Sequence, residues 1–142
     1  MCSKRRSGYL LALNNHNLPI REEYIVTGGF REEDGRRAFE KLAEKGPLPQ
    51  AIFAVNDLVA IGAYHAIKER GLRIPDDVAL VGFGDNALSS YLDPPLTTVR
   101  QSPYEMGKQS AEIHLDWFLH PAEIPVIQER TIPTQLIIRK FS

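Results

Sequence analysis

Three short segments carry residue types that suit the binding of a small ligand, and each directly follows an apolar run. They are residues 28–30, 56–57 and 82–85, with the sequences Gly-Gly-Phe, Asn-Asp and Gly-Phe-Gly-Asp. The ring of Phe30, placed just past a Gly-Gly turn, suits stacking on the flat apolar face of a ligand. The alternative for Phe30 is packing on the helix that follows it.

The second segment has two interpretations. The amide of Asn56 offers an acceptor oxygen and two donor hydrogens, a combination that matches a pair of hydroxyl groups. The alternative for Asn56 is capping of a helix, because Asn and Asp are preferred at helix N-caps. Asp57 is expected to cap that helix under either interpretation.

Residues that would support catalysis are not found in a known spacing. His65 and His114 fall within predicted helices, and no H-E-x-x-H, C-x-x-C, G-x-S-x-G or P-loop pattern occurs. Residues 82–87 match the G-x-G-x-x-G/A dinucleotide fingerprint. That fingerprint also needs an acid about 20 residues later, where this chain has Arg100 and Gln101. We therefore expect no catalytic residue, no metal ligand and no cofactor, so the protein is not expected to be an enzyme.

The elements that must position these segments alternate along residues 7–85. Apolar or β-rich runs cover residues 24–27, 51–55 and 78–83, and helical patterns cover residues 7–15, 31–45 and 56–70. This alternation predicts an α/β fold, a parallel sheet with helices on both faces, with 51–55 and 78–83 as neighbouring central strands. Parallel sheets bind ligands beyond the carboxyl ends of their strands, where the three segments fall.

The pattern changes after Tyr91. The expected elements are a strand over residues 96–100, a helix from Pro103 to His120, and strands over residues 126–132 and 134–139. Proline segments at 94–95 and 121–125 are candidate crossovers between two lobes.

Composition narrows the class of protein. The chain has 142 residues, 43% hydrophobic and 25% charged, which suits one folded domain rather than a disordered chain. Its net charge of −1 lacks the basic excess typical of nucleic-acid-binding domains. The single cysteine, Cys2, cannot form an internal disulfide, and no apolar run approaches the roughly 18 residues that span a bilayer. A basic and then apolar start at residues 4–13 has no cleavage site, so we expect a cytoplasmic protein with no membrane partner.

Four motifs follow one another in the chain: residues 51–57 (Ala-Ile-Phe-Ala-Val-Asn-Asp), 71–78 (Gly-Leu-Arg-Ile-Pro-Asp-Asp-Val), 81–83 (Val-Gly-Phe) and 94–101 (Pro-Pro-Leu-Thr-Thr-Val-Arg-Gln). Together they closely resemble the LacI/GalR family of bacterial transcription repressors, with similarity from Arg5 to Arg139. The resemblance implies the fold of periplasmic sugar-binding proteins, in which two α/β lobes hold a small ligand in the cleft between them. It also implies a non-enzymatic role, in which an effector controls transcription.

The resemblance covers only the carboxyl-terminal part of the family's effector-binding region. It implies that residues 1–96 form the C-terminal lobe, that residues 97–125 cross into an incomplete first lobe, and that residues 126–142 return. The family's helix-turn-helix head is missing from this chain, so DNA would be bound only through such a head. The implied partners are a small-molecule effector, a sugar or sugar acid, and a second copy of the chain.

When the family's effector-contacting positions are matched one by one to this sequence, the resemblance implies six candidate effector contacts: Arg5, Phe30, Asn56, Gly84, Asp85 and Gln101. Arg5 falls where the family places an arginine that grips the effector, and Phe30 falls at an aromatic that lies against it. This chain departs from the family pattern at two positions. Gly84 stands where the family has an aspartate and is followed by Asp85, and Gly29 stands where the family has a second acid. These replacements leave more positive charge near Arg5, so an acidic sugar is expected rather than a neutral hexose.

Association is the last implication. The helix after residues 56–57 is apolar around much of its circumference, more than one sheet face requires. Family members pair through this helix and a following loop, which implies a homodimer interface containing Ile61, Tyr64, Tyr91 and Leu92. The alternative function is a free-standing sugar-binding or transport protein of the same fold, which the lack of a secretion signal disfavours.

Overall fold

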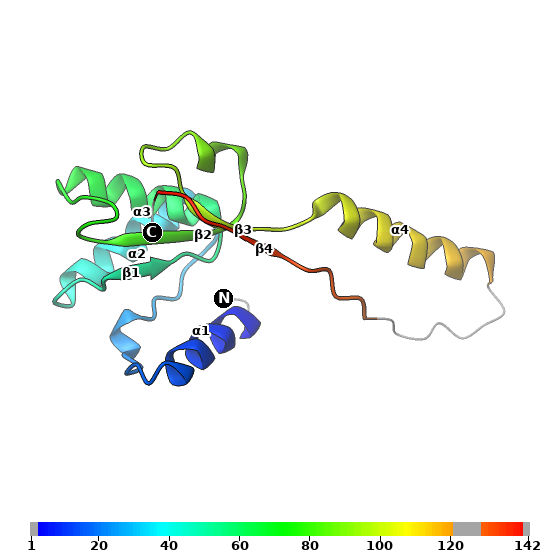
Figure 1. Ribbon diagram of the computed structural model, residues 1–142, viewed down its shortest axis with the longest axis horizontal. Helices are drawn as coiled ribbons and strands as arrows, with labels where there is room; N and C mark the ends of the chain where they lie inside the picture. The colour runs from blue at the N-terminus through cyan, green and yellow to red at the C-terminus, as the bar shows by residue number, and fades with distance from the viewer. Residues whose placement is uncertain (1–2, 121–128, 141–142) are drawn as a thin grey trace.

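The computed structural model describes residues 3–120 and 129–140, and one four-stranded sheet lies at its centre (Figure 1). The strands are β1 (Ala51–Phe53), β2 (Ala79–Gly84), β3 (Thr97–Arg100) and β4 (Gln135–Ile137), in the spatial order β1-β2-β3-β4. The first three strands are parallel, and β4 runs antiparallel to β3. The expected α/β fold, with a mostly parallel sheet, is confirmed.

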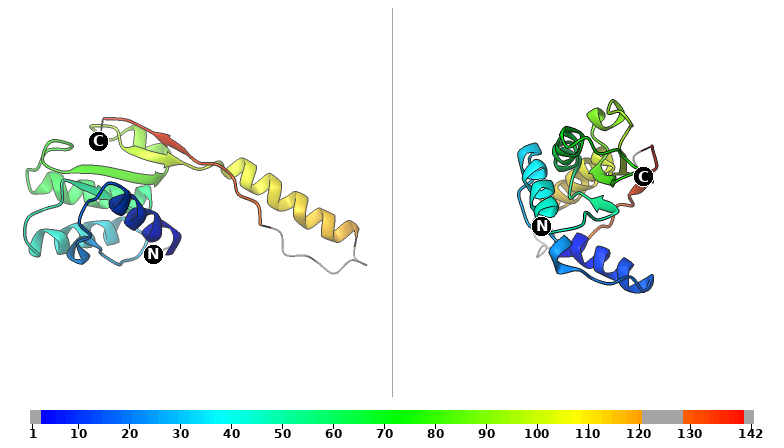
Figure 2. Two further views of the ribbon diagram at one scale, coloured as in Figure 1. Left: turned by 60° about the horizontal axis from the view of Figure 1, so that its bottom comes forward. Right: turned by 90° about the vertical axis from the view of Figure 1, so that its left-hand side faces the viewer.

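The described ranges also contain four α-helices and two 3-10 turns. They are α1 (Ser3–Asn15), α2 (Glu32–Glu44), α3 (Asp57–Glu69) and α4 (Pro103–Leu119), with η1 (Glu22–Tyr24) and η2 (Ala87–Ser90). Helices α2 and α3 pack together on one face, and α1 lies on the opposite side of the sheet (Figure 2). The expectation of helices on both faces is thus met, although only the α2–α3 face forms a dense core.

That core is built from side chains that are almost fully removed from solvent. Phe39 of α2, Ile67 of α3 and Leu80 of β2 are at most 1% exposed, together with Val78 and Leu96 from the flanking loops. Burying side chains of this size contributes about 1.5 to 3 kcal/mol each. The α2–α3 face therefore fixes the sheet and, with it, the strand ends that hold the candidate site.

Two glycines set the close approach of α2 and α3. A side chain on Gly35 of α2 would collide with the Val59 backbone, and a side chain on Gly62 of α3 would collide with the Glu32 backbone. The two helices consequently touch through their main chains, which brings the first turn of α3 next to the loop before α2.

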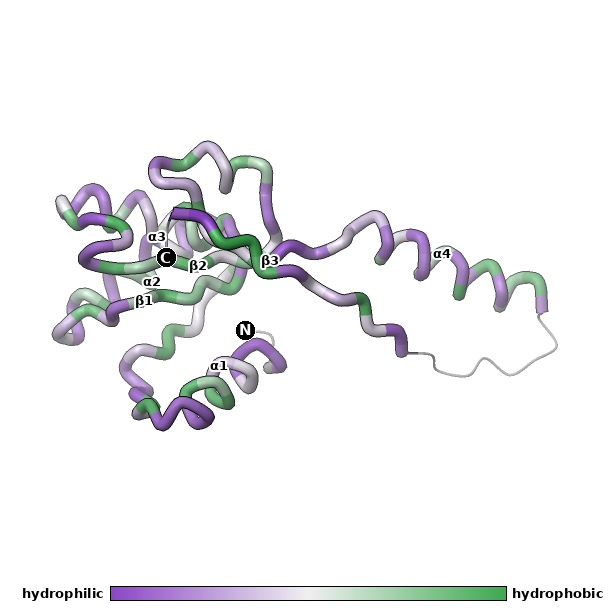
Figure 3. The backbone as a smooth tube through the Cα atoms, in the orientation of Figure 1, coloured by the Kyte–Doolittle hydropathy of each residue, from purple (hydrophilic) through white to green (hydrophobic). Residues whose placement is uncertain are grey.

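Helix α4 projects from the sheet as an arm and has no buried residue (Figure 1). Large apolar side chains nevertheless occur along it, as the mixed colouring of this helix in Figure 3 shows. Tyr104 and Phe118 are 83% and 76% exposed. Pro103 occupies the first turn of α4, as its position in the sequence predicts.

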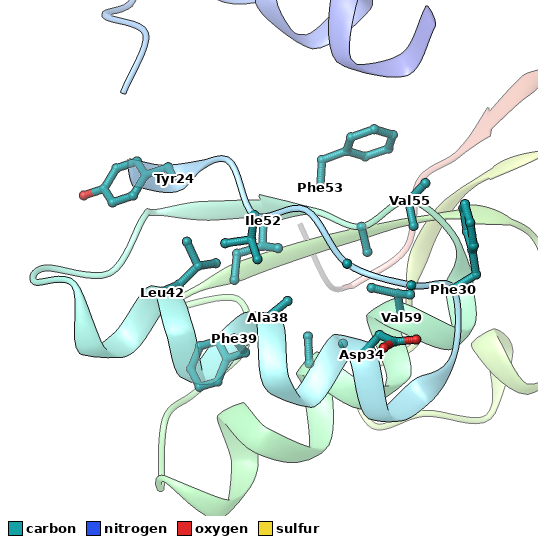
Figure 4. A pocket seen from close by; sticks show the side chains of 16 residues that line it. Tyr24, Phe30, Asp34, Ala38, Phe39, Leu42, Ile52, Phe53, Val55 and Val59 are labelled. Carbon is teal, nitrogen blue, oxygen red and sulfur yellow. The ribbon is translucent and has the colours of Figure 1, made fainter. Parts of the chain in front are cut away.

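The strand expected over residues 24–27 is wrong. Tyr24 instead ends the turn η1, and its hydroxyl group donates to the carbonyl oxygen of Pro47 at 2.9 Å. The following residues pass beside β1 without strand pairing (Figure 4). As a result β1 is an edge strand of the described sheet, not the expected central one, and Phe53 is 43% exposed on the α1 side.

Two later expectations also need correction. Residues 97–100, assigned from the sequence to the crossover, form β3 inside the sheet, so the chain leaves the sheet only after Arg100. Residues 129–132 contain no strand, and the remaining part of that expected strand, residues 126–128, lies outside the described residues. The strand expected over 134–139 is present as the shorter β4. Over the described ranges, we find no helix with the length and apolar character needed to cross a membrane.

Candidate functional site

Arg5 connects α1 to the carboxyl ends of β1 and β2. Its Nη1 atom donates to the carbonyl oxygen of Val55 at 2.6 Å, and its guanidinium lies 3.8 Å from the centroid of the Phe83 ring. Such stacking is a favourable cation–π contact. Within the described ranges Arg5 has no carboxylate partner, so its positive charge is not neutralised by an ion pair.

Asn56 unites the two roles that the sequence offers as alternatives. Its Oδ1 atom accepts from the Val59 backbone N–H at 2.8 Å, which caps α3. Its Nδ2 atom donates to the Phe30 carbonyl oxygen at 2.9 Å. Capping is therefore shown, and the same amide fixes the loop that carries Phe30.

Phe30 is not buried against the helix that follows it. The residue is 54% exposed, and its ring stands beside Val55 at one end of an elongated apolar pocket between β1 and α2 (Figure 4). Gly29 lies in the same loop, where a side chain would collide with the carboxylate of Asp34. That carboxylate accepts from the Arg31 backbone N–H at 3.0 Å at the start of α2, so glycine at position 29 makes room for the helix cap.

Asp57 has a role that the sequence analysis missed. It does not cap α3: its carboxylate is buried, with Oδ1 accepting from the Thr98 hydroxyl at 2.6 Å. Its Oδ2 accepts from the Ser89 hydroxyl at 2.7 Å and from the Asn86 backbone N–H at 2.6 Å. The carboxylate thus holds β3 and the turn η2 against the first turn of α3. No local sequence pattern signals this role, because Ser89 lies in η2 and Thr98 lies within β3, both far from Asp57 along the chain.

The carboxylate of Asp85 forms ion pairs with two arginines, one on β3 and one next to β4. It accepts from Arg100 Nε at 2.6 Å and from Arg139 Nη2 at 2.8 Å. Partial burial raises the pKa of Asp85, but the hydrogen bonds from Arg139 and Arg100 outweigh that effect and leave the pKa below its ordinary value. Asp85 is therefore a charged structural link, and its described contacts do not include Arg5.

Gly84 adopts a backbone conformation that side chains rarely tolerate, with φ at +135°. An aspartate there would be strained in this conformation, whatever charge it supplied. Gly84 therefore differs from an aspartate in the backbone conformation that it allows as well as in charge.

Gln101 and Arg5 meet at an open pocket of about 250 Å³ beside the start of α4. Its lining is completed by Phe83, Ser102, Met106, Arg130, Ile132, Pro133 and Thr134. Arg5 and Gln101 are the two candidate residues that line this pocket. Asn56 and Phe30 lie further along the same rim, and Gly84 and Asp85 turn toward β3. Arg130 was not singled out from the sequence, which places it in an unrelated strand. Over the described residues, no group of three His, Cys, Asp or Glu side chains is arranged to hold a metal ion.

The residues expected at a dimer interface differ in exposure. Tyr91 is 83% exposed, whereas Ile61 is only 6% exposed because the chain's own fold already covers it. The expectation that a partner buries Ile61 needs correction on this point. Tyr64 and Leu92 are partly buried against the core, and the Tyr64 hydroxyl donates to the Asp93 carbonyl oxygen at 3.2 Å.

A parallel sheet with a polar rim at its strand ends defines a ligand-binding α/β lobe. Comparison with known proteins places this lobe in a family. The model of the periplasmic binding protein-like domain matches residues 3–140. The transcriptional repressor PurR of Haemophilus influenzae strain PittEE is 36% identical over 137 residues, 96% of this chain and 41% of PurR. The probable repressor ExuR of Bacillus subtilis strain 168 is 45% identical over 118 residues, 83% of this chain and 35% of ExuR.

The structure of a complex of the transcriptional regulator CelR with cellobiose superposes with a TM-score of 0.90 at 30% identity, covering 97% of this chain and 42% of that one. The chain belongs to the periplasmic binding protein-like family, in the branch formed by the effector-binding domains of LacI/GalR regulators. It spans about two-fifths of the length of the curated relatives it matches.

Proposed function

We propose that this chain is the part of a LacI-type transcriptional regulator that senses a small carbohydrate effector without catalysing a reaction. The observation that carries the proposal is Arg5, whose guanidinium is held over Phe83 at the strand ends and beside Gln101 and has no carboxylate partner among the residues that the structure describes. A guanidinium offers several fixed donors to the hydroxyl or acid groups of a sugar. The relative CelR, described in complex with cellobiose, supports a carbohydrate ligand.

The rest of the regulator enters the proposal through its relatives. PurR and ExuR are described as repressors of the helix-turn-helix type, so DNA would be bound by a head outside the segment that matches this chain. We propose that the chain crosses to a first lobe after Arg100, within the segment 97–125 assigned to the crossover, and that residues 126–142 return. The regulator would act as a homodimer in the cytoplasm, with exposed Tyr91 at the contact. A free-standing transport protein of the same fold is less well supported, because these relatives are repressors.

Calorimetric titration of the 142-residue chain with neutral and acidic monosaccharides tests the proposal. We expect at least one to bind, and Arg5→Ala to abolish that binding while the far-UV circular dichroism spectrum stays unchanged. Arg6→Ala is the matched control, because Arg6 is the next residue of α1 and its guanidinium pairs with Glu22 at 3.4 Å instead of reaching the rim. Absence of binding by every sugar, or equal effects of the two substitutions, contradicts the proposal.

A further inference from the structure

Among the described residues that line the pocket shared by Arg5 and Gln101, there is a second cationic side chain, Arg130, and no acidic one. We propose that this pocket is the seat of an anionic group of the ligand, a carboxylate or a phosphate, and that Arg5 and Arg130 are its two charge partners. The inference rests on the proposed function, because it specifies the chemical class of the effector that the same rim takes.

The pocket draws its residues from distant parts of the chain. Arg5 comes from α1, Phe83 from β2 and Gln101 from the link between β3 and α4, whereas Arg130 and Thr134 lie on the segment that leads into β4. The polar lining therefore consists of two guanidiniums, an amide and the hydroxyls of Ser102 and Thr134. All of these groups donate hydrogen bonds, which is the donor set that a carboxylate or phosphate requires.

The charge of this lining is positive from three directions. The guanidinium of Arg5 has no carboxylate partner in the described ranges, and the Arg130 Nη1 atom is 3.6 Å from an exposed Glu112 carboxylate that Lys108 shares. The positive end of α4 also opens at the pocket. Its N-cap residue, Ser102, does not use its side chain to cap the helix, so that hydroxyl stays available to a ligand.

The nearest carboxylate in the sequence does not cancel this charge. Asp85 follows β2 by one residue, but its two oxygens are bonded to Arg100 and Arg139. A bidentate guanidinium–anion contact is stronger and more directional than a neutral hydrogen bond. An anionic group can therefore form charge-assisted hydrogen bonds in this pocket that a neutral hydroxyl group cannot form.

Calorimetry with matched ligands tests the inference on the 142-residue chain. Glucose is compared with glucuronate, gluconate and glucose 6-phosphate, and inorganic phosphate is titrated alone. We expect an acidic ligand to bind at least about tenfold more tightly than glucose. A hydrogen bond to a charged group contributes more binding free energy than a neutral one, and the difference corresponds to about a tenfold change in affinity. Affinity for the acidic ligand should fall steeply as salt is raised, whereas glucose should show little change.

Arg130→Gln should weaken the acidic ligand about tenfold or more and leave glucose unchanged. The matched control is Arg6→Gln, because it removes the same charge from an equally exposed arginine, 45% against 44%, that also pairs with a glutamate. Glu112→Gln should strengthen the acidic ligand, since it releases Arg130 from its ion pair.

Each outcome bears on the anionic seat and on the carbohydrate effector separately. Tight binding of glucose with no preference for acids, or equal effects of Arg130→Gln and Arg6→Gln, overturns the anionic seat while the carbohydrate effector stands. Binding of inorganic phosphate that depends on Arg130, without binding of any sugar derivative, supports the seat and overturns the carbohydrate effector. If none of the probes binds, both are overturned.

Discussion

Replacing Asp57 should unfold much of the rim, because its carboxylate is the acceptor for three donors. In Asp57→Ala the hydroxyls of Ser89 and Thr98, both fully buried, lose their acceptor together with the Asn86 backbone N–H. A buried donor without a partner costs about 1 to 3 kcal/mol. Asn86 is exposed and can bond to water instead, so two buried donors are left without a partner and the expected loss is about 2 to 6 kcal/mol of unfolding free energy.

Asp57→Asn should cost less, about 1 to 2 kcal/mol, because the amide oxygen can keep the two donors at Oδ2 while one bond is lost. The measurement is urea denaturation followed by far-UV circular dichroism. Tryptophan fluorescence is a poor probe, since Trp117 lies on the projecting helix α4. The control is Asp76→Ala, an exposed carboxylate 3.3 Å from Arg73, which should cost less than about 0.5 kcal/mol. A loss below about 1 kcal/mol in Asp57→Ala would refute the reasoning.

Three further predictions concern packing, pH and association. Gly62→Ala should destabilise the chain by about 2 kcal/mol or more in urea denaturation, whereas Gly107→Ala, with open space around it on α4, should be neutral or stabilising by up to about 1 kcal/mol. Because the folded-state pKa of Asp85 is lowered, its contribution is complete above about pH 4 and is lost as the pH falls further; Asp85→Asn should remove that part of the acid dependence of unfolding. Tyr91→Glu should convert the proposed dimer into a monomer in sedimentation; an unchanged sedimentation coefficient speaks against this contact.

The alternation of apolar runs with helical patterns predicted the sheet, because burial of whole strands and one helix face leaves a direct trace in the sequence. The prediction was wrong at residues 24–27, which form no strand although they are rich in β-forming residues. Tyr24 instead ends a turn, and its hydroxyl group donates to the carbonyl oxygen of Pro47. The prediction was also wrong at β1, because Phe53 is apolar yet faces the α1 side at an edge. Composition records how apolar a segment is, but not which neighbour covers it.

The candidate site was predictable only in part. The carboxyl ends of strands and the capping role of Asn56 follow from local rules, and the structure agrees with them. Arg5 and Arg130 line the same pocket although they lie near opposite ends of the chain. No local sequence pattern predicts that they come together. Asp57 was misassigned because an aspartate at a helix start commonly caps the helix, whereas here Asn56 already does so.

The three consecutive residues 55–57 connect α1, the Phe30 loop, β3 and η2 at this rim. The carbonyl oxygen of Val55 receives Arg5, the amide of Asn56 holds the Phe30 loop, and the carboxylate of Asp57 holds β3 and η2. Each bond comes from a different segment, so the geometry of the rim depends on one stretch of main chain between β1 and α3. This arrangement explains why a residue at this stretch cannot be assigned to structure or to ligand binding alone: the bonds that cap α3 and fix the turns also place Arg5 and Phe30 where a ligand would meet them.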